Sequence, residues 1–158
     1  MTRRRLFAFP ILLIASIALQ LIHLPDAIAP ARPLLVPMLF AYWTYISPAG
    51  ASILLAWLVG LTLDVLFNTA LGEHALALMI SVWVVHRLRR VMLMVSFWQT
   101  TLVLIPAWAA YTVVMFWIDG VRGQQADIWT RWLPIASSVI LWPFLFPVLS
   151  MIGKPSRD

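Results

Sequence analysis

The chain has 158 residues, of which 63% are hydrophobic and 11% are charged. Soluble domains are only about 45–50% apolar, so the composition excludes an ordinary soluble domain and predicts an integral membrane protein. The formal net charge of +5 does not indicate a nucleic-acid partner, because the basic residues stand in short clusters beside apolar runs. The chain has no cysteine, which excludes disulfides and thiolate metal sites.

Segment lengths predict the architecture. A helix that crosses a bilayer needs about 20 residues, so six such helices would occupy about 120 positions and leave only short connections. We therefore predict one integral membrane domain, residues 1–158, that forms an all-α, polytopic bundle of six transmembrane helices. The expected spans cover about residues 6–24, 33–47, 51–67, 74–88, 95–118 and 132–152.

The first expected helix follows Arg3, Arg4 and Arg5. Its apolar run is longer than the core of a signal peptide, which has about 7–15 residues, so we expect it to be retained. The second expected helix is short for a bilayer and contains Pro37.

Aromatic residues accompany the far end of this second helix. They are Tyr42, Trp43 and Tyr45. Tyr and Trp are enriched where membrane helices meet the headgroups. We therefore expect these three residues to mark the membrane interface.

The third and fourth helices are joined by the polar turn 68–74. The fourth is expected to end at the basic cluster of Arg87, Arg89 and Arg90. The fifth contains Pro106, which removes one backbone donor and predicts a kink. The sixth is predicted to bend as well, because it contains Pro143 and Pro147.

The eleven basic residues indicate the orientation, because cytoplasmic loops carry the excess of Lys and Arg. Three of them, Arg32, Arg122 and Arg131, fall on one side of six spans. The other side carries Arg3, Arg4, Arg5, Arg87, Arg89, Arg90, Lys154 and Arg157. We therefore predict that both termini are cytoplasmic. The two arginine clusters are expected at the membrane interface, where they attract anionic lipid.

Asp64 lies inside the apolar run 53–67, with no cationic side chain within one helical turn. An uncompensated carboxylate in hydrocarbon costs several kcal/mol, so Asp64 is expected to face protein or water, or to be protonated. Because Asp64 is near the end of its span, two roles stay open. It packs against, or accepts hydrogen bonds from, the polar turn that follows, or it takes a direct part in binding.

The surroundings of Asp64 suggest a helix-docking face. Gly60, Asp64 and Asn68 recur every four residues, and Trp57 is adjacent. A glycine one turn from a carboxylate lets a neighbouring helix approach closely. We predict that another helix packs over Gly60, with its backbone or a side chain near Asp64.

A second candidate cluster lies at the same outer depth. Gln20 lies on the polar face of the first expected helix, and His23 is close to it in sequence. His74 lies in the turn after the third expected helix. Either Gln20 contacts Asp64, or each finds its own partner or water. The two histidines and Asp64 lack the i,i+3 or i,i+4 spacing of metal ligands on a helix, so we predict no metal and no other cofactor.

Catalytic patterns are missing from the sequence. It contains no nucleophile elbow with a Ser-His-Asp set, no HExxH, no glycine-rich phosphate loop and no paired intramembrane carboxylates. A proton-driven transporter would show several intramembrane ionisable groups or repeated halves, and we find neither. We predict that the chain is not an enzyme.

Several short motifs stand in a characteristic order along the chain. They are Arg32-Pro33, Tyr42-Trp43, Pro48, Gly60-Leu61-Thr62-Leu63-Asp64, Leu71-Gly72, Ala75-Leu76, Trp98-Gln99 and Trp142-Pro143. In this order they resemble the bacterial rod shape-determining MreD family. The resemblance spans nearly the whole chain, and its most specific part is the stretch 32–76.

The resemblance implies a non-enzymatic component of the cell-elongation machinery in the bacterial inner membrane. It implies six helices, similar to the substrate-binding subunits of vitamin transporters. The implied partners are MreC directly and, through the complex, MreB, RodA and the elongation-specific penicillin-binding transpeptidase. On this reading, Gly60 and Asp64 dock the partner's transmembrane helix or hold open the outer half of the bundle.

The alternative function is a capture subunit of a vitamin-type importer. Six short helices and polar residues on the outer side favour it. The small number of convergent polar groups speaks against it, because a vitamin site needs several placed donors and acceptors.

Overall fold

The computed structural model of the chain describes residues 3–22, 25, 28–48, 51–123 and 127–151. This part of the chain forms six α-helices and one short 3-10 turn, and it contains no strand. The all-helical class expected from the composition is therefore confirmed. The elements are α1 (Arg3–Leu21), η1 (Ala29–Ala31), α2 (Leu35–Ile46), α3 (Ile53–Phe67), α4 (Glu73–Met94), α5 (Phe97–Val121) and α6 (Ile128–Ser150).

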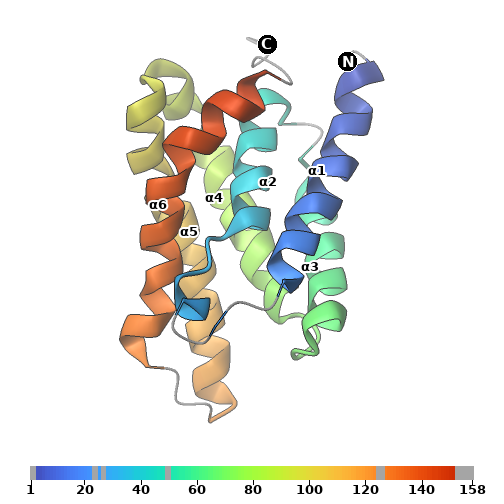
Figure 1. Cartoon of the computed structure of the whole chain (residues 1–158), viewed down its shortest axis with the longest axis vertical. Helices are drawn as coiled ribbons and strands as arrows, with labels where there is room; N and C mark the ends of the chain where they lie inside the picture. Colours follow the sequence, from blue (N-terminus) through green and yellow to red (C-terminus); the bar gives the residue numbers. More distant parts are fainter. Residues whose placement is uncertain (1–2, 23–24, 26–27, 49–50, 124–126, 152–158) are drawn as a thin grey trace.

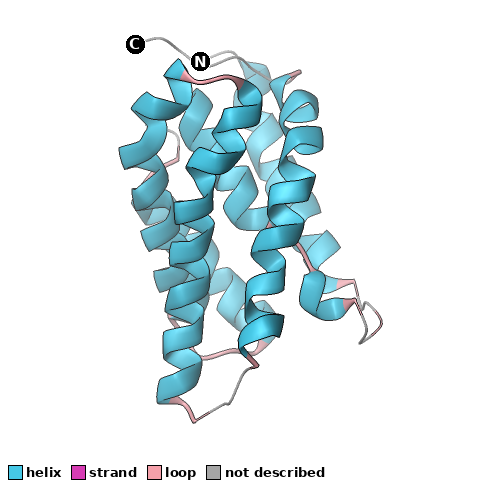
Figure 2. Cartoon of the chain, turned by 90° about the vertical axis from the view of Figure 1, so that its left-hand side faces the viewer, coloured by secondary structure: helices cyan, strands magenta, loops and turns pink. Residues whose placement is uncertain are grey.

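The helices form a bundle in which successive helices run in opposite directions (Figure 1). The view turned by 90° shows them extended along the same long axis (Figure 2). Consequently α1 begins and α6 ends at one end of the bundle, which we call the proximal end. We call the opposite end, where α3 and α5 end and α4 and α6 begin, the distal end.

α2 is the central helix, and it packs against α1, α4, α5 and α6. All of its residues except Leu35 and Tyr45 are buried. A helix that is apolar on every side is stable only when it is surrounded, and here the longer helices enclose it. Pro37 is tolerated because it stands in the first turn, where backbone N–H groups have no partner within the helix.

The expectation that Tyr42 and Trp43 mark the membrane interface is wrong. Their exposed fractions are 1% and 4%. Trp43 packs on the ring of Phe9 of α1, with the ring centroids 4.7 Å apart, and Tyr42 packs on Phe146 of α6. These two aromatic residues join the central helix to its neighbours.

The turn between α3 and α4 depends on two residues with positive φ. α3 ends at Asn68, whose φ of 53° is left-handed, a conformation that Asn tolerates. Gly72, with a φ of 99°, precedes α4. α4 then continues to Met94, beyond its expected end near residue 88, because the arginine-rich stretch contains no residue that breaks a helix.

α3 and α4 touch through their backbones at Gly60. A Cβ atom on Gly60 would lie 2.2 Å from Cα of Ala75. Real Cβ atoms never come this close to a backbone atom, so only glycine fits here. The close approach expected over Gly60 is present, and the helix that makes it is α4 of the same chain.

α5 and α6 are continuous through their internal prolines, Pro106 in α5 and Pro134, Pro143 and Pro147 in α6. Their contact includes Trp108 and Trp142, which are fully buried with ring centroids 5.6 Å apart. Two stretches of the described residues, Trp98–Val121 and Thr130–Ser150, are long and apolar enough to cross a membrane. Shorter apolar stretches cover Ala8–Leu21 and Ile53–Phe67, and the expectation of six spans stays a prediction.

Gly60→Ala is expected to destabilise the fold by about 1–3 kcal/mol, because the new methyl group overlaps the α4 backbone. Thermal unfolding of the purified chain in detergent measures the effect. Gly120→Ala is the matched control, since a Cβ there meets nothing within 4 Å. It should be neutral or stabilising by up to about 1 kcal/mol. Equal effects of the two substitutions would contradict the close contact.

Candidate functional site

Asp64 caps the first turn of the helix that follows its own. Its side chain is buried in α3, and Oδ2 accepts a hydrogen bond from the backbone N–H of Gly72 at 2.7 Å. Oδ1 accepts one from the backbone N–H of His74, also at 2.7 Å. The first N–H groups of a helix have no partner within it and carry partial positive charge. The carboxylate therefore satisfies two unpaired donors of α4 and is stabilised by the α4 dipole.

Two side chains of the same turn complete the shell around this carboxylate. Nδ1 of His74 lies 2.9 Å from Oδ1 of Asp64. The hydroxyl of Thr69 lies 3.2 Å from the same oxygen and 3.2 Å from Nδ1 of His74. Buried carboxylates are tolerated when their oxygens accept several hydrogen bonds, and Asp64 meets that condition within residues 69–74.

Of the two roles left open for Asp64, its geometry is that of a helix cap. Among the described residues, Gln20 is not one of its hydrogen-bond partners, and α1 packs against α2. Of the two alternatives for Gln20, contact with Asp64 is therefore not made, and Asp64 finds its own partners in residues 69–74. His23, the third member of the expected outer cluster, lies outside the described residues.

Two further pairs of opposite charge join the distal ends of successive helices. Oε2 of Glu73, at the start of α4, lies 3.0 Å from Nη1 of Arg122 after α5. Asp119 of α5 forms an ion pair with Arg131 of α6. Both carboxylates are buried, and both arginines are partly exposed. A buried carboxylate needs such a partner, so these pairs hold α4, α5 and α6 in place.

Arg32, which follows η1, connects the loop to the end of α1. Its guanidinium donates to the backbone carbonyl of Gln20 and, at 2.6 Å, to that of Ile22. The backbone N–H of Leu34 donates to the hydroxyl of Ser138 in α6 at 2.9 Å. The segment between α1 and α2 is therefore bound to α1 through Arg32 and to α6 through Leu34.

Sequence reasoning missed the roles of Glu73 and Asp119 and used Arg122 and Arg131 only as markers of orientation. One signal was available. Five of the six acidic residues fall within or beside the three distal connections, and these are Asp26, Asp64, Glu73, Asp119 and Asp127. The same three connections carry Arg32, Arg122 and Arg131. Carboxylates and arginines that share one end of a bundle indicate ion pairs between helices.

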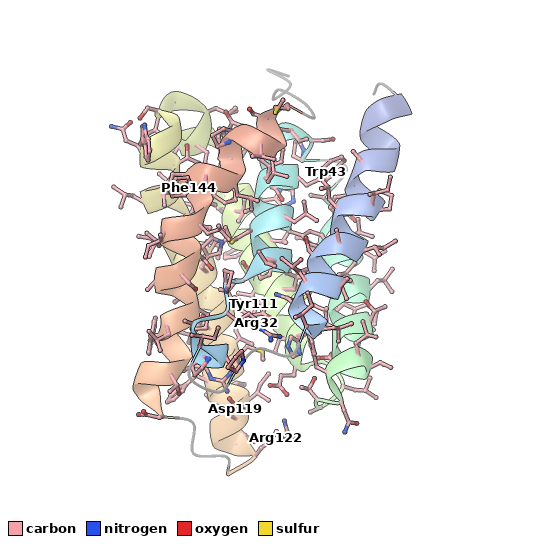
Figure 3. All side chains as sticks on the ribbon, in the orientation of Figure 1. Arg32, Trp43, Tyr111, Asp119, Arg122 and Phe144 are labelled. Carbon is pink, nitrogen blue, oxygen red and sulfur yellow. The ribbon has the colours of Figure 1, made fainter. Side chains whose placement is uncertain are left out.

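A pocket of about 250 Å³ opens among these connections. Its polar lining comes from Gln20, Arg32, His74, Tyr111 and Arg131, and its apolar lining includes Phe67 and Met115. Arg32 and Tyr111 both line the pocket, and in the view of Figure 3 their labels stand together, above those of Asp119 and Arg122. The structure thus brings Gln20 and His74 to one pocket, as members of the expected outer cluster, together with two arginines.

The four residues of the expected docking face separate into two sets. Gly60 and Asp64 are buried against α4, whereas Trp57 and Asn68 are exposed. Trp57, at i−3 from Gly60, lies about 60° around the helix from the contact with α4. Asn68 follows the last residue of α3 in a left-handed conformation and so leaves the helix face. A partner can therefore touch Trp57 and Asn68, but α4 occupies the surface over Gly60.

The predicted basic residues at the proximal end also make contacts within the chain. Nε of Arg89 donates to the carbonyl of Tyr45 at 3.3 Å, near the end of α2. The guanidinium of Arg87 lies 5.2 Å from the ring centre of Trp83, a cation–π contact, and Arg90 is exposed. The side chains of Arg3, Arg4 and Arg5, and all of Lys154 and Arg157, lie outside the described part.

Comparison with known proteins identifies this arrangement. The fold is an all-helical bundle with two helices apolar and long enough to cross a membrane, fastened at one end by buried charges. The profile of the rod shape-determining protein MreD family matches residues 2–152. The rod shape-determining protein MreD of Haemophilus influenzae (strain ATCC 51907 / DSM 11121 / KW20 / Rd) is 26% identical over 141 residues, which are 89% of this chain and 87% of that protein.

The chain belongs to the MreD family, as its motifs predicted. The family consists of membrane proteins that act as structural components in shape determination, and it is not a known enzyme family. No solved structure matches the chain. The expected likeness to the substrate-binding subunits of vitamin transporters therefore stays a prediction.

Asp64→Ala is expected to lower the free energy of unfolding by about 2 kcal/mol or more, because it leaves buried donors of α4 unsatisfied. Thermal unfolding in detergent gives the change, and faster hydrogen exchange at the amides of Gly72 and His74 locates it. The control is Asp127→Ala, since Asp127 precedes α6 without making a side-chain cap. Similar losses for the two variants would refute the cap.

A double-mutant cycle tests the pair between Glu73 and Arg122. Arg122→Gln leaves a buried carboxylate without its cation and should cost about 1–3 kcal/mol. Adding Glu73→Gln removes the uncompensated charge, so the double variant should be more stable than the sum of the single changes by about 1–2 kcal/mol. Unfolding in detergent measures all four proteins, and additive losses would show that the pair does not couple.

Proposed function

We propose that this chain is a non-enzymatic membrane component of the bacterial cell-elongation complex. It helps to maintain rod shape by organising lateral peptidoglycan synthesis together with MreC. MreB, RodA and the elongation-specific penicillin-binding transpeptidase join through the complex. Membership of the shape-determining family supports this role.

In this proposal the chain lies in the inner membrane, with six spans and both termini in the cytoplasm. The alternating directions of α1 to α6 support it (Figure 1). The charge distribution supports it as well. Eight of the eleven basic residues belong to the two terminal segments and to the stretch 87–90, which α4 places at the proximal end.

The docking surface for MreC in this proposal is the outward face of α3. α3 packs chiefly against α4, so it stands at an edge of the bundle. Its outward face exposes Leu58 and Val65, which are 48% and 71% accessible. A shallow groove runs along this face, and Leu58, Leu61, Thr62, Val65 and Leu66 line it.

The groove suits a transmembrane helix because membrane helices associate through close packing, and the side chains of a partner helix can fit between those of α3. Trp57 and Asn68 are exposed beside it. Gly60 and Asp64 lie on the opposite side of α3, where they fix this helix against α4 and so keep the groove rigid. The expected docking residues thus act in two ways, by contact and by support.

The importer alternative has one observation in its favour, the distal pocket. Its volume of about 250 Å³ is below the range of about 300–1,000 Å³ that is usual for small-molecule sites. His74 and Arg131 of its lining are already paired with carboxylates of the chain, so few convergent polar groups remain for a vitamin. The pocket therefore supports the importer function less well than family membership supports the shape function.

Photo-crosslinking in native membranes tests the docking surface. A photoreactive residue at position 58 or 65 should form adducts with MreC, because both positions line the groove. Positions 113 and 140 are the controls, since Val113 on α5 and Ile140 on α6 are equally exposed. Immunodetection of MreC in the crosslinked bands is the readout. Adducts with MreC at the controls and none at 58 or 65 would move the interface away from α3.

Rod shape gives the functional readout in cells that lack their own copy of the gene. Val65→Trp should reduce capture of MreC and yield rounded cells, because the indole fills the groove. Ile140→Trp should leave capture and shape unchanged. If Val65→Trp supports normal rods and normal capture, MreC does not use this face.

A further inference from the structure

An apolar groove between α1, α2 and α6 begins beside the distal pocket. This groove, of about 160 Å³, has Leu19 of α1, Leu35 and Leu39 of α2 and Leu145 of α6 in its walls. The polar pocket is lined by Gln20 and Leu34, the immediate neighbours of Leu19 and Leu35. The lining of the site therefore changes along its length from polar at the distal end to apolar toward the middle of the bundle.

The polar part of this site contains two arginines, of which Arg131 is paired with Asp119 and Arg32, among the described residues, has no such pair. Within the described residues Arg32 has no carboxylate partner, and its guanidinium donates only to the carbonyls of Gln20 and Ile22. A guanidinium has five N–H donors, so several remain for a ligand. Arg131 adds a buried Nε that has no hydrogen-bond partner in the described part of the chain.

Tyr111 provides a further donor at the pocket wall. It comes from the middle of α5 and is largely buried, and its ring meets that of His74 edge-on. Tyr111 lines the pocket, and a phenol hydroxyl can donate to an acceptor there. Two guanidinium groups and a phenol suit a ligand with several acceptor oxygens, such as a phosphate.

We propose that the pocket and the groove together bind one membrane lipid with an anionic phosphate headgroup. The phosphate lies at Arg32, Arg131 and Tyr111, and one acyl chain follows the groove between α1 and α6. The apolar groove distinguishes this ligand from a free phosphate ion, since burial of its methylene groups stabilises the chain there. α1 also exposes Ile11 and Ile14, which are next in sequence to the groove residues Leu12 and Ala15, so this helix presents apolar surface near the groove.

The inference is independent of MreC, because the site lies between α1 and α6 whereas the proposed docking face belongs to α3. Headgroup recognition by basic pockets between membrane helices has a simple electrostatic origin. Each basic residue near the membrane surface contributes about a fivefold preference for an anionic lipid. Arg32 follows η1 and Arg131 belongs to α6, so the lipid would bridge the segment before α2 and the last helix.

Native mass spectrometry of the full chain, purified in non-ionic detergent, tests the inference. The probes are dioleoyl phosphatidylglycerol, dioleoyl phosphatidylcholine and inorganic phosphate. We expect one phosphatidylglycerol to be retained with about fivefold preference over phosphatidylcholine. Excess inorganic phosphate should not displace it. Equal retention of the two lipids would overturn the proposal, and full displacement by inorganic phosphate would assign the pocket to a free anion.

Variants of the two halves of the site make the test specific. Arg32→Gln should lower retention of phosphatidylglycerol about fivefold, and Tyr111→Phe, which keeps the ring, should lower it without loss of the fold. Ala15→Trp, which fills the groove, should lower retention of both lipids. The controls are Arg90→Gln, an exposed arginine at the proximal end, and Leu66→Trp on α3.

The controls distinguish a specific lipid-binding site from non-specific association of lipid with the protein surface. Unchanged retention in Arg90→Gln and Leu66→Trp, with losses in the three site variants, supports the lipid site. Retention that falls as much in the controls as in the site variants shows only charge attraction and a lipid belt. Unchanged retention in both Tyr111→Phe and Ala15→Trp, each folded by thermal unfolding, would remove the site.

Discussion

The carboxylate of Asp64 at the first turn of α4 is the interaction on which the distal end depends. It joins two consecutive helices by hydrogen bonds to the backbone N–H groups of Gly72 and His74, which have no partner within their own helix. These bonds hold the turn 68–72 and thereby set the direction in which α4 leaves it. The close contact between Gly60 and Ala75 follows directly, because the turn brings the first residues of α4 back over the last two turns of α3.

The same principle extends to the other distal connections. Glu73 with Arg122 and Asp119 with Arg131 place buried carboxylates opposite arginines of the next helix, and Arg32 attaches the loop before α2 to α1. In an apolar bundle the helices gain little from hydrophobic sorting among themselves once lipid surrounds them. Charged and hydrogen-bonded contacts at one end therefore specify which helices are neighbours. The apolar packing around α2 fills the interior without selecting that order.

The structure separates a framework from free surfaces, as the family role requires. A protein that organises other proteins needs a stable framework and exposed surfaces that partners can bind. α2 and the polar contacts of the distal end supply the framework, and the outward face of α3 and the cleft between α1 and α6 remain outside it. The proximal end is held differently, by Arg89 on the carbonyl of Tyr45 and by the ring of His86, whose Nε2 lies 2.9 Å from the carbonyl of Ala51. Both ends are closed by side chains that reach across to backbone atoms of another element.

The sequence by itself determined the helical class, the approximate position of each helix except the end of α4, and the family. Long apolar runs, turn residues and ordered motifs are local features, and local features are readable along the chain. It also indicated that Gly60 admits a close neighbour and that Asp64 needs protein partners. Only the tertiary structure decided which neighbour and which partners, because burial and pairing depend on residues far apart in the sequence. Tyr42 and Trp43 look like interface residues in a short helix, yet the four surrounding helices bury them. Arg122 and Arg131 look like loop charges, and folding alone brings Glu73 and Asp119 to them.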